Sequence, residues 1–137
     1  MAGHPLVSIV TPSFNQGRFI WETIESVLSQ EGDFAIEYLV MDGGSTDGSV
    51  KVIRRYADLV AAHQWPVRCR GIVMAWVSAR DEGQTAAINS GLGRATGEII
   101  SYINSDDLYF PGAFQRVVEV FTRDPAADFV YGDGDVI

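Results

Sequence analysis

Glu98-Ile99-Ile100-Ser101-Tyr102-Ile103-Asn104-Ser105-Asp106-Asp107 is the stretch that decides the fold of this chain. Its apolar first part predicts a buried strand over residues 98–103, and two adjacent carboxylates follow where that strand would stop. Adjacent carboxylates at the end of a buried strand are costly unless a cation neutralises them. In a parallel α/β sheet, this arrangement is typical of a site that holds a divalent metal and a phosphorylated ligand.

Segments with strand and helix patterns alternate along the rest of the chain. Further strands are expected at residues 6–10, 38–41, 71–77 and 129–131. Helical spacing of apolar residues predicts helices over residues 20–28, 50–56, 85–92 and 114–121. Thr46 or Asp47 is expected to cap the second helix, and Pro111 to open the last one. This alternation predicts the α/β class, with a mostly parallel sheet and helices on both faces.

Length and composition limit the class of protein. A chain of 137 residues, 47% hydrophobic and 20% charged, predicts a single globular domain over residues 1–137. The net charge of −8 and the scattered basic residues exclude a nucleic-acid-binding surface. Cys69 is the only cysteine, which excludes an intramolecular disulfide and fits a reducing compartment. We expect no secretory signal, no transmembrane segment and a cytoplasmic location.

The candidate site lies where the expected strands end, because ligands of open parallel sheets bind beyond the carboxyl ends of the strands. Four of the five expected strand ends carry an aspartate: the stretches concerned are 42–45, 78–84, 104–107 and 132–133. A single aspartate there usually forms a turn, but a row of them repels itself unless a cation binds. Mg²⁺ or Mn²⁺ suits such oxygen ligands. No phosphate-binding glycine motif is present, so a metal would hold the phosphates.

At these strand ends the chain resembles the inverting glycosyltransferases of family two. The resemblance is carried by Val7-Ser8-Ile9-Val10-Thr11-Pro12-Ser13-Phe14-Asn15, Asp42-Gly43-Gly44-Ser45-Thr46-Asp47, Asp81-Glu82-Gly83-Gln84 with Asn89-Ser90-Gly91, and Ile103-Asn104-Ser105-Asp106-Asp107. These blocks follow the order of the family at compatible spacing and cover nearly the whole chain. The resemblance implies the GT-A fold, a Rossmann-like fold of nucleotide-diphospho-sugar transferases, truncated at the C-terminus.

The resemblance also implies which residues of the first two blocks bind the nucleotide-sugar. Thr11 and Pro12 would border the nucleobase, Thr11 through its backbone groups, and Ser13 and Asn15 belong to the same binding segment. Asp42 would hydrogen-bond the base, typically uracil.

The later blocks would bind the rest of the donor. Asp81 would lie near the nucleoside or the sugar, and Arg80 would approach a phosphate. The Asp-x-Asp motif of the family falls on Asn104, Ser105 and Asp106, so that Asp106 would be the metal ligand. Asn104 departs from the family pattern, because an amide replaces the carboxylate that would face the ribose and the donor sugar.

The function implied is metal-dependent transfer of a sugar, with inversion, from a nucleotide-diphosphate sugar to an acceptor hydroxyl. The donor would be UDP-linked, and the acceptor a glycan, a lipid-linked molecule or another hydroxyl compound. Such enzymes build cell-envelope polysaccharides, in the cytoplasm or peripherally at the inner face of the membrane. The general base of the family lies further along the chain, and neither Asp133 nor Asp135 is assigned to that role. We therefore expect the chain to be the donor-binding part of a longer enzyme, which binds nucleotide with metal but transfers poorly.

Three other readings stay open at this point. A nucleotidyltransferase would need a glycine-rich basic loop after the first strand, where this chain has one glycine and a late Arg18. A receiver-like signalling domain could use Asp42 as phospho-acceptor, but the only lysine, Lys51, lies in an expected helix. A catalytically incomplete nucleotide-binding or interaction module fits the short length.

Overall fold

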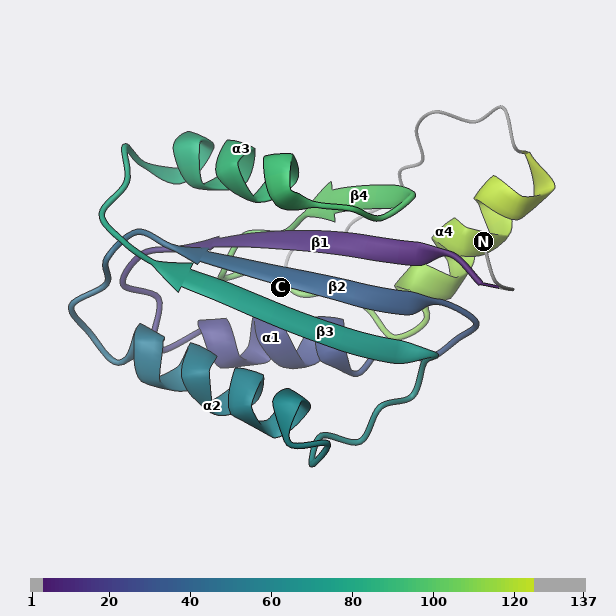
Figure 1. Cartoon of the computed structure of the whole chain (residues 1–137), viewed down its shortest axis with the longest axis horizontal. Helices are drawn as coiled ribbons and strands as arrows, with labels where there is room; N and C mark the ends of the chain where they lie inside the picture. Colours follow the sequence, from purple (N-terminus) through teal and green to yellow (C-terminus); the bar gives the residue numbers. More distant parts are fainter. Residues whose placement is uncertain (1–3, 125–137) are drawn as a thin grey trace.

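The computed structural model of the chain describes residues 4–124, which form helices on both faces of a four-stranded sheet (Figure 1). The strands are β1 (Leu6–Ser13), β2 (Ala35–Asp42), β3 (Gly71–Ser78) and β4 (Ile99–Tyr102). Their order in the sheet is β3-β2-β1-β4, and every neighbouring pair is parallel. The predicted α/β class with a parallel sheet is confirmed. All carboxyl ends of the strands therefore meet at one edge of the sheet.

The connecting helices divide between the two faces. Helices α1 (Ile20–Leu28) and α2 (Ser49–Ala61) lie on one face, and α3 (Gln84–Arg94) lies on the other (Figure 1). Helix α4 (Ala113–Arg123) lies near the end where the strands begin, and its Phe114 ring packs 5.8 Å from the ring of Phe34. Within residues 4–124, none of the helices combines the length and the apolar character that a membrane crossing requires.

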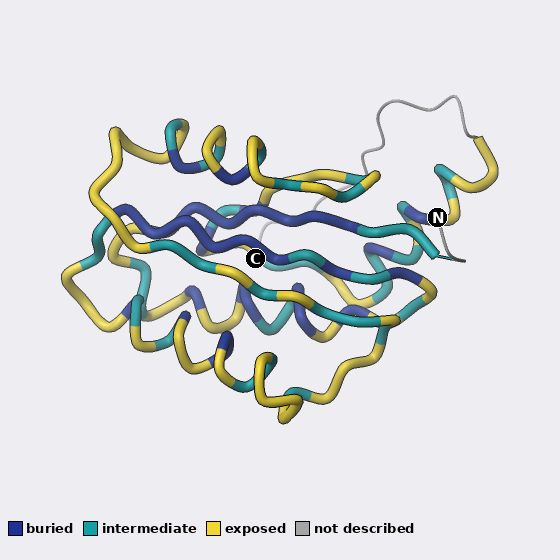
Figure 2. The backbone as a smooth tube through the Cα atoms, in the orientation of Figure 1, coloured by how far each residue is buried: buried dark blue, intermediate teal, exposed yellow. Residues whose placement is uncertain are grey.

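The main core lies between the sheet and the α1–α2 layer. β1 and β2 are buried over most of their length (Figure 2). Alternate residues along a strand point to opposite faces, so each strand supplies both layers. The α1–α2 face of the sheet packs with buried residues that include Val7, Ile9, Ile36, Tyr38, Ile20, Ile24 and Ile53. A smaller cluster of Val10, Leu39, Met41 and Ala87 lies beneath α3.

Several elements begin or end differently from the sequence prediction: β2 begins at Ala35, three residues earlier than expected, and α2 extends to Ala61. β1 runs beyond Val10 to Ser13 and includes Pro12. A proline fits there because β4 ends at Tyr102, opposite Val10, so no strand on that side needs the missing N–H group. Helix α4 begins at Ala113 rather than Pro111, because Gly112 takes the N-cap position with a left-handed φ of 83°.

The N-terminus of α2 also differs in detail. Its N-cap residue is Gly48, not Thr46 or Asp47. Asp47 still serves the helix, because its Oδ1 accepts hydrogen bonds from the Ser49 backbone N–H at 2.9 Å and from the Ser49 hydroxyl at 2.6 Å. The strand predicted at residues 129–131 lies outside the described residues.

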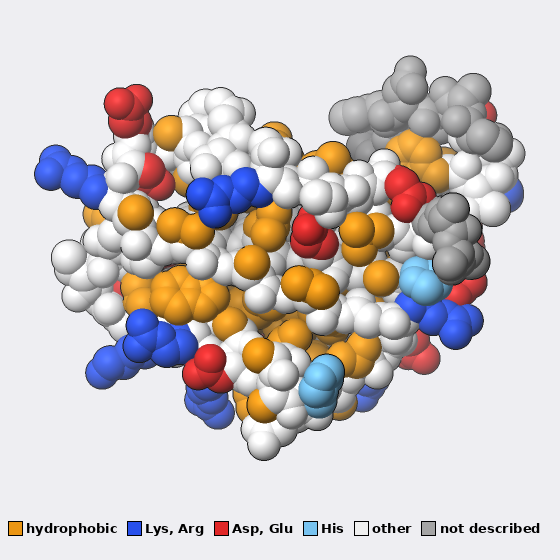
Figure 3. Space-filling model, viewed as in Figure 1, with side chains coloured by type: hydrophobic (Ala, Val, Ile, Leu, Met, Phe, Trp, Pro, Cys, Tyr) orange, Lys and Arg blue, Asp and Glu red, His pale blue; other side chains and the backbone are white. Residues whose placement is uncertain are grey.

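Surface charge agrees with the scattered basic residues of the sequence. On the face seen in Figure 3, Lys and Arg side chains lie among acidic and apolar ones and do not gather into one basic patch. The face in view does not have the basic stripe that is typical of nucleic-acid-binding proteins.

Helix α3 approaches the sheet very closely at Gly91. A Cβ atom at this position would overlap Val10 Cγ1 and would lie 3.0 Å from Val10 Cγ2 and 3.1 Å from Met41 Cγ. Two residues later, a Cβ atom on Gly93 would meet nothing within 4 Å. The two glycines of one helix therefore differ sharply in the space around them.

We predict opposite effects for alanine at these two glycines. Gly91→Ala should lower the free energy of unfolding by about 1–3 kcal/mol, because the added methyl group pushes α3 away from β1. Gly93→Ala should raise it by up to about 1 kcal/mol through helix propensity. Urea denaturation of both variants measures the difference, and equal effects would contradict the close packing of α3.

Candidate functional site

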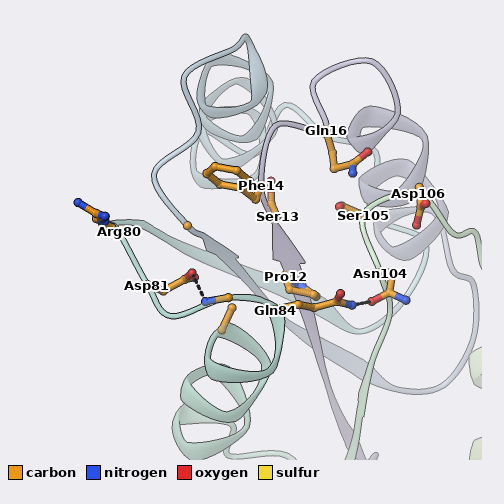
Figure 4. A pocket seen from close by; sticks show the side chains of 13 residues that line it. Pro12, Ser13, Phe14, Gln16, Arg80, Asp81, Gln84, Asn104, Ser105 and Asp106 are labelled. Carbon is orange, nitrogen blue, oxygen red and sulfur yellow. Dashed lines mark hydrogen bonds between the residues drawn. The ribbon is translucent and has the colours of Figure 1, made fainter.

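A cleft of about 550 Å³ opens at the carboxyl edge of the sheet. Its walls come from the loops that follow β1, β2, β3 and β4 and from the start of α3 (Figure 4). Most of the predicted site residues line it: Pro12, Ser13, Arg80, Asp81, Asn104, Ser105 and Asp106. The parallel sheet thus gathers residues that are up to 94 positions apart in the sequence, from Pro12 to Asp106.

Asp42 is not on the cleft wall but buried beneath it. Its carboxylate accepts five hydrogen bonds, and the residue is only 2% exposed. Oδ1 accepts from the hydroxyls of Ser13 and Ser45, at 2.9 and 2.6 Å. Oδ2 accepts from the Ser78 hydroxyl at 2.8 Å and from the backbone N–H groups of Gly44 and Ser45, at 3.1 and 2.8 Å. Asp42 therefore ties together the ends of β1, β2 and β3 and the loop after β2.

These hydrogen bonds keep Asp42 ionised. Burial by itself would raise the pKa of the carboxyl, but the hydrogen bonds from Ser45, Ser78 and Ser13 outweigh it and lower the pKa below its ordinary value. A carboxylate held in this way has no lone pair directed outward for a phosphoryl group, which argues against the receiver-like reading. Its predicted contact with a nucleobase stays a prediction.

Thr11 and Asn15 also lie off the cleft wall. The Thr11 side chain is fully buried, and its hydroxyl lies 2.8 Å from the Tyr38 hydroxyl in a hydrogen bond. Asn15 has a left-handed φ of 53° and joins two loops, because its Oδ1 accepts from the Thr46 backbone N–H at 2.9 Å. Its own backbone N–H donates to the Ser45 hydroxyl at 2.8 Å. Asn15 therefore organises the loops that form the cleft, whereas Thr11 joins β1 to β2 within the core.

Asp81 is held at the mouth of the cleft by its neighbours. Its Oδ1 accepts from the Gly83 backbone N–H at 2.9 Å. The carboxylate lies against Gly43, since a Cβ atom there would come within 2.9 Å of Oδ1 and 3.0 Å of Oδ2. Gly43 has to be small for Asp81 to occupy this place.

An amide pair crosses the cleft below Asp106. Gln84, the first residue of α3, donates its Nε2–H to Oδ1 of Asn104, which follows β4 (Figure 4). Asn104 is the position at which the sequence departs from the Asp-x-Asp pattern. The asparagine at this position therefore has a hydrogen-bond partner, Gln84, on helix α3.

The loop that carries Asp106 is anchored on polar residues of α1 and its end. The Thr23 hydroxyl donates to the Asp107 carbonyl oxygen at 2.6 Å, and the Ser26 hydroxyl accepts from the Tyr109 N–H at 3.2 Å. Gln30, which is 1% exposed, forms hydrogen bonds with the backbone further along this segment, at Phe110 and Phe114. Thr23 and Ser26 lie three residues apart on one face of α1, and Gln30, two residues beyond the end of the helix, is joined to Ser26 by a hydrogen bond.

Gln30 makes two hydrogen bonds to the segment after β4 and one to α1. Its Nε2 donates to the carbonyl oxygens of Ser26 and Phe110, at 3.0 and 2.9 Å. Its Oε1 accepts from the Phe114 backbone N–H at 3.1 Å, at the start of α4. A buried amide therefore satisfies main-chain groups of α1, of the segment after β4 and of the start of α4.

Several cleft residues were not predicted as site residues from the sequence. Phe14 is 59% exposed on the lip, and Gln16, Gly43 and Gln84 line the walls. Phe14 directly follows an apolar strand, and an aromatic residue in such a position is typical of the hydrophobic core. Its position directly after Thr11-Pro12-Ser13 at a strand end was the available signal.

The residues of the cleft fit a divalent metal only together with a ligand. Among residues 4–124, no three His, Cys, Asp or Glu side chains gather into a metal-binding group. Asp106 is an exposed carboxylate on the cleft wall, with Ser105 beside it. Mg²⁺ and Mn²⁺ commonly bind through one or two carboxylates and complete their shell with water and substrate phosphates. Asp106 fits that donor set.

Comparison with known proteins gives a family match over almost the whole chain. The model of Glycosyl transferase family 2 matches residues 8–135. An uncharacterized glycosyltransferase of Nostoc sp. (strain PCC 7120) is 35% identical over 115 residues, which are 84% of this chain and 32% of that relative. TuaG of Bacillus subtilis, a putative teichuronic acid biosynthesis glycosyltransferase, is 29% identical over 115 residues, 84% of this chain and 41% of TuaG. The chain spans less than half the length of these relatives.

Solved structures share the fold. TarS of S. aureus in complex with UDP-GlcNAc has a TM-score of 0.69 and 19% identity, over 85% of this chain and 31% of that one. The mannosyltransferase PcManGT of Pyrobaculum calidifontis, in complex with GDP-Man and Mn²⁺, has a TM-score of 0.68 and 24% identity, over 88% and 33% of the two chains. Both are GT-A glycosyltransferases, so the predicted GT-A fold is confirmed.

We predict that alanine and asparagine at position 42 have different costs. Asp42→Ala should lower the free energy of unfolding by about 3 kcal/mol or more, because five donors lose their acceptor. Asp42→Asn should cost about 1 kcal/mol, because an amide oxygen in place of Oδ2 still accepts from the two N–H groups while the amide NH₂ donates to hydroxyls that can rotate. Urea denaturation at neutral pH measures both.

The difference in stability between wild type and Asp42→Asn should depend on pH. Because the folded-state pKa of Asp42 is below its ordinary 3.8, the stability that it contributes is complete above that value and is lost as the pH falls through the lower folded pKa. The advantage of wild type over Asp42→Asn should therefore shrink below pH 3.8. An advantage that grows on acidification would contradict the assignment.

We also predict that Gln30 is needed to fasten the Asp106 loop. Gln30→Met keeps the length of the side chain but leaves the Phe114 N–H and the Phe110 carbonyl without it, so the free energy of unfolding should fall by about 2–4 kcal/mol. Hydrogen exchange at the Phe114 amide should accelerate. The neighbouring exposed Ser29, changed to alanine, should alter stability by less than about 0.5 kcal/mol; a similar loss in both variants would refute the role of Gln30.

Proposed function

The chain belongs to glycosyl transferase family 2, and on this basis we propose that it binds a nucleotide-diphosphate sugar for transfer to an acceptor hydroxyl with inversion. The observation that carries the proposal is the cleft at the carboxyl edge of the sheet, where Phe14, Arg80, Asp81 and Asp106 meet. It combines an aromatic surface, a cation and two carboxylates. These are the groups needed for a base, a diphosphate and a metal.

The nucleoside lies, in this proposal, between Phe14 and Asp81. Phe14 offers an exposed ring at the lip, beside Pro12 and Ser13 (Figure 4). Stacking of a base on an aromatic side chain contributes about 1–3 kcal/mol. The Asp81 carboxylate accepts hydrogen bonds and can read a base N–H or a ribose hydroxyl. We propose uracil as the base, with Asp42 acting by shaping the loop that carries Gly43.

The diphosphate lies, in this proposal, toward Asp106, and Arg80 approaches it from the opposite side of the cleft, where it follows β3 beside Asp81 (Figure 4). Arg80 is exposed and offers a guanidinium group, which suits phosphate oxygens. Asp106 would hold Mg²⁺ or Mn²⁺, which when bound supplies Lewis-acid stabilisation of the departing diphosphate. Asp106 and Ser105 orient the phosphate side, while the loop bonds from Thr23 and Gln30 keep this wall in place.

Inverting transfer also needs a general base that takes the proton of the acceptor hydroxyl. Both cleft carboxylates, Asp81 and Asp106, serve the donor in this proposal. We therefore propose that the base comes from outside residues 4–124. Asp133 and Asp135, neither of which is assigned as the base, lie outside the described residues.

The names of similar proteins support this choice of substrate class. TarS and PcManGT are described in complex with UDP-GlcNAc and GDP-Man, and PcManGT also with Mn²⁺. TuaG is named for teichuronic acid biosynthesis. We propose, on this support, a role in cell-envelope polysaccharide synthesis at a cytoplasmic location, including the inner face of the membrane.

We predict that Asp106, and not its neighbour Asp107, makes nucleotide binding metal-dependent. Wild type should bind UDP more tightly with Mn²⁺ than in EDTA, and Asp106→Ala should lose this gain because the metal loses its protein ligand. Asp107→Ala should keep it, because Asp107 is equally exposed but does not line the cleft. Isothermal titration calorimetry with UDP, and with GDP in parallel, measures the three proteins with Mn²⁺ and in EDTA.

Two outcomes would contradict the proposal. Absence of binding to both nucleotides, with and without Mn²⁺, would remove the donor site. Equal loss of the Mn²⁺ effect in both aspartate variants would remove Asp106 as the specific ligand.

A further inference from the structure

A small group of cations lies on the outer face of helix α2. Lys51, Arg54 and Arg55 are three of the ten basic residues of the chain, and all three are exposed. Their spacing of three and four residues places them on one side of the helix, where they line an open groove of about 510 Å³. Figure 3 shows basic side chains over the first half of α2, beside an apolar surface. The other basic residues are distributed over loops and over α3 and α4.

Positive charge predominates on this face of α2. Within residues 4–124, none of the three cations belongs to an ion pair. Asp58 is the only acidic residue of α2, so three cations stand against one carboxylate. The acidic residues of the neighbouring helix α1 are Glu22 and Glu25, and the Glu25 carboxylate is turned to Tyr56, whose hydroxyl donates to it at 2.5 Å. The excess of positive charge is therefore greatest on the side of α2 that borders β3, where Arg54 lies.

That side of α2 also borders an aromatic ring. The Arg54 guanidinium lies 5.5 Å from the centre of the Trp76 ring, which belongs to β3 and is partly exposed. β3 is an outer strand of the described sheet, so no further strand of residues 4–124 covers this margin. The apolar ring and polar N–H group of a tryptophan suit the boundary between lipid headgroups and acyl chains. Cations and ring together form a surface with the two properties of a membrane interface.

An anionic membrane fits this surface better than a single small anion does. The three cations lie on the convex outside of a helix, over little more than one turn, so they can contact several headgroups at once but cannot enclose one ligand. Each cation near a membrane of anionic lipids strengthens binding about fivefold. The chain as a whole carries a charge of −8, so an anionic membrane repels most of its surface and favours the orientation in which α2 approaches.

The position of α2 relates this surface to the cleft. The N-cap residue of α2, Gly48, follows the loop after β2, so the helix begins at the carboxyl edge of the sheet, where the cleft opens (Figure 1). Lys51, Arg54 and Arg55 lie in the first two turns of the helix. A protein docked through these residues holds the cleft close to the headgroups, where a lipid-linked acceptor would present its hydroxyl group.

We propose that the outer face of α2 docks on membranes that contain anionic phospholipids, with Lys51, Arg54 and Arg55 at the headgroups and Trp76 at the rim of the contact. The proposal goes beyond the donor site, because none of these residues lines the cleft. It names the surface that would hold the protein at a membrane.

Two variants with the same change of charge test this surface. The α2 variant combines Lys51→Gln, Arg54→Gln and Arg55→Gln. The control variant removes the same charge from exposed positions on α3 and α4: Arg94→Gln, Arg116→Gln and Arg123→Gln. Both should unfold at the urea concentration of wild type, because all six side chains are exposed.

The experiment is cosedimentation with vesicles of phosphatidylcholine, with and without phosphatidylglycerol. Wild type should sediment only with vesicles that contain phosphatidylglycerol, and added salt should release it. The α2 variant should bind these vesicles on the order of a hundredfold more weakly, because it lacks three cations that each contribute about fivefold. The control variant should lose less than about fivefold. Both variants should bind UDP as wild type does in calorimetric titration.

Four results would overturn the proposal. These are absence of wild-type binding to vesicles with phosphatidylglycerol, equal binding to vesicles without it, insensitivity to salt, and equal losses in the two variants. Binding of soluble heparin through the three α2 cations, without sedimentation with vesicles, would assign the surface to an anionic glycan and also overturn it. Failure to bind UDP or GDP would contradict the proposed function, whereas vesicle binding by the same protein would leave the α2 surface standing.

Discussion

The arrangement of this site depends on one buried charge, the carboxylate of Asp42. An ionised group out of water is tolerable only when donors surround it, and here five do so. Three of them are serine hydroxyls from β1, from the loop after β2 and from β3. The hydrogen bonds that satisfy the charge of Asp42 therefore also hold the strand ends in alignment. Backbone bonds from Gly43 to Ser13 and from Ala79 to Asp42, at 2.8 and 3.0 Å, continue the sheet pattern to the edge of the cleft.

The opposite wall is held in another way. There the loop after β4 makes main-chain hydrogen bonds to Thr23, Ser26 and Gln30, so a helix on one face of the sheet supports residues at its edge. One wall thus depends on a charge and the other on neutral polar groups. Functional loops need a rigid scaffold of this kind, because their own backbone has few partners. Acid should loosen the first wall before the second.

The fold could be predicted from the sequence more completely than the hydrogen bonds inside the site. The spacing of apolar residues shows which side of each element is buried. The carboxyl ends of parallel strands lie at the same edge of a sheet, so the location of the cleft could be predicted. The position of Asp106 on the cleft wall could be predicted in the same way. The partners of Asp42 could not, because Ser13 and Ser78 lie 29 and 36 residues away and nothing local marks them. The expected contact of Asp42 with a nucleobase came from the family resemblance, which says nothing of these partners, and it stays a prediction. Phe14 was overlooked because an aromatic residue after a strand has the pattern of a core residue.

The contact between Gly43 and Asp81 links two positions that come from different loops. The Asp81 carboxylate occupies the space in which any side chain at position 43 would begin. A larger residue at 43 is compatible with the cleft only if residue 81 becomes shorter or turns away, so substitutions at the two positions are not additive. If related chains carry this carboxylate at position 43 instead of position 81, we expect both positions to have changed together. A library that varies position 43 therefore has to vary position 81 as well, because the two side chains compete for one space.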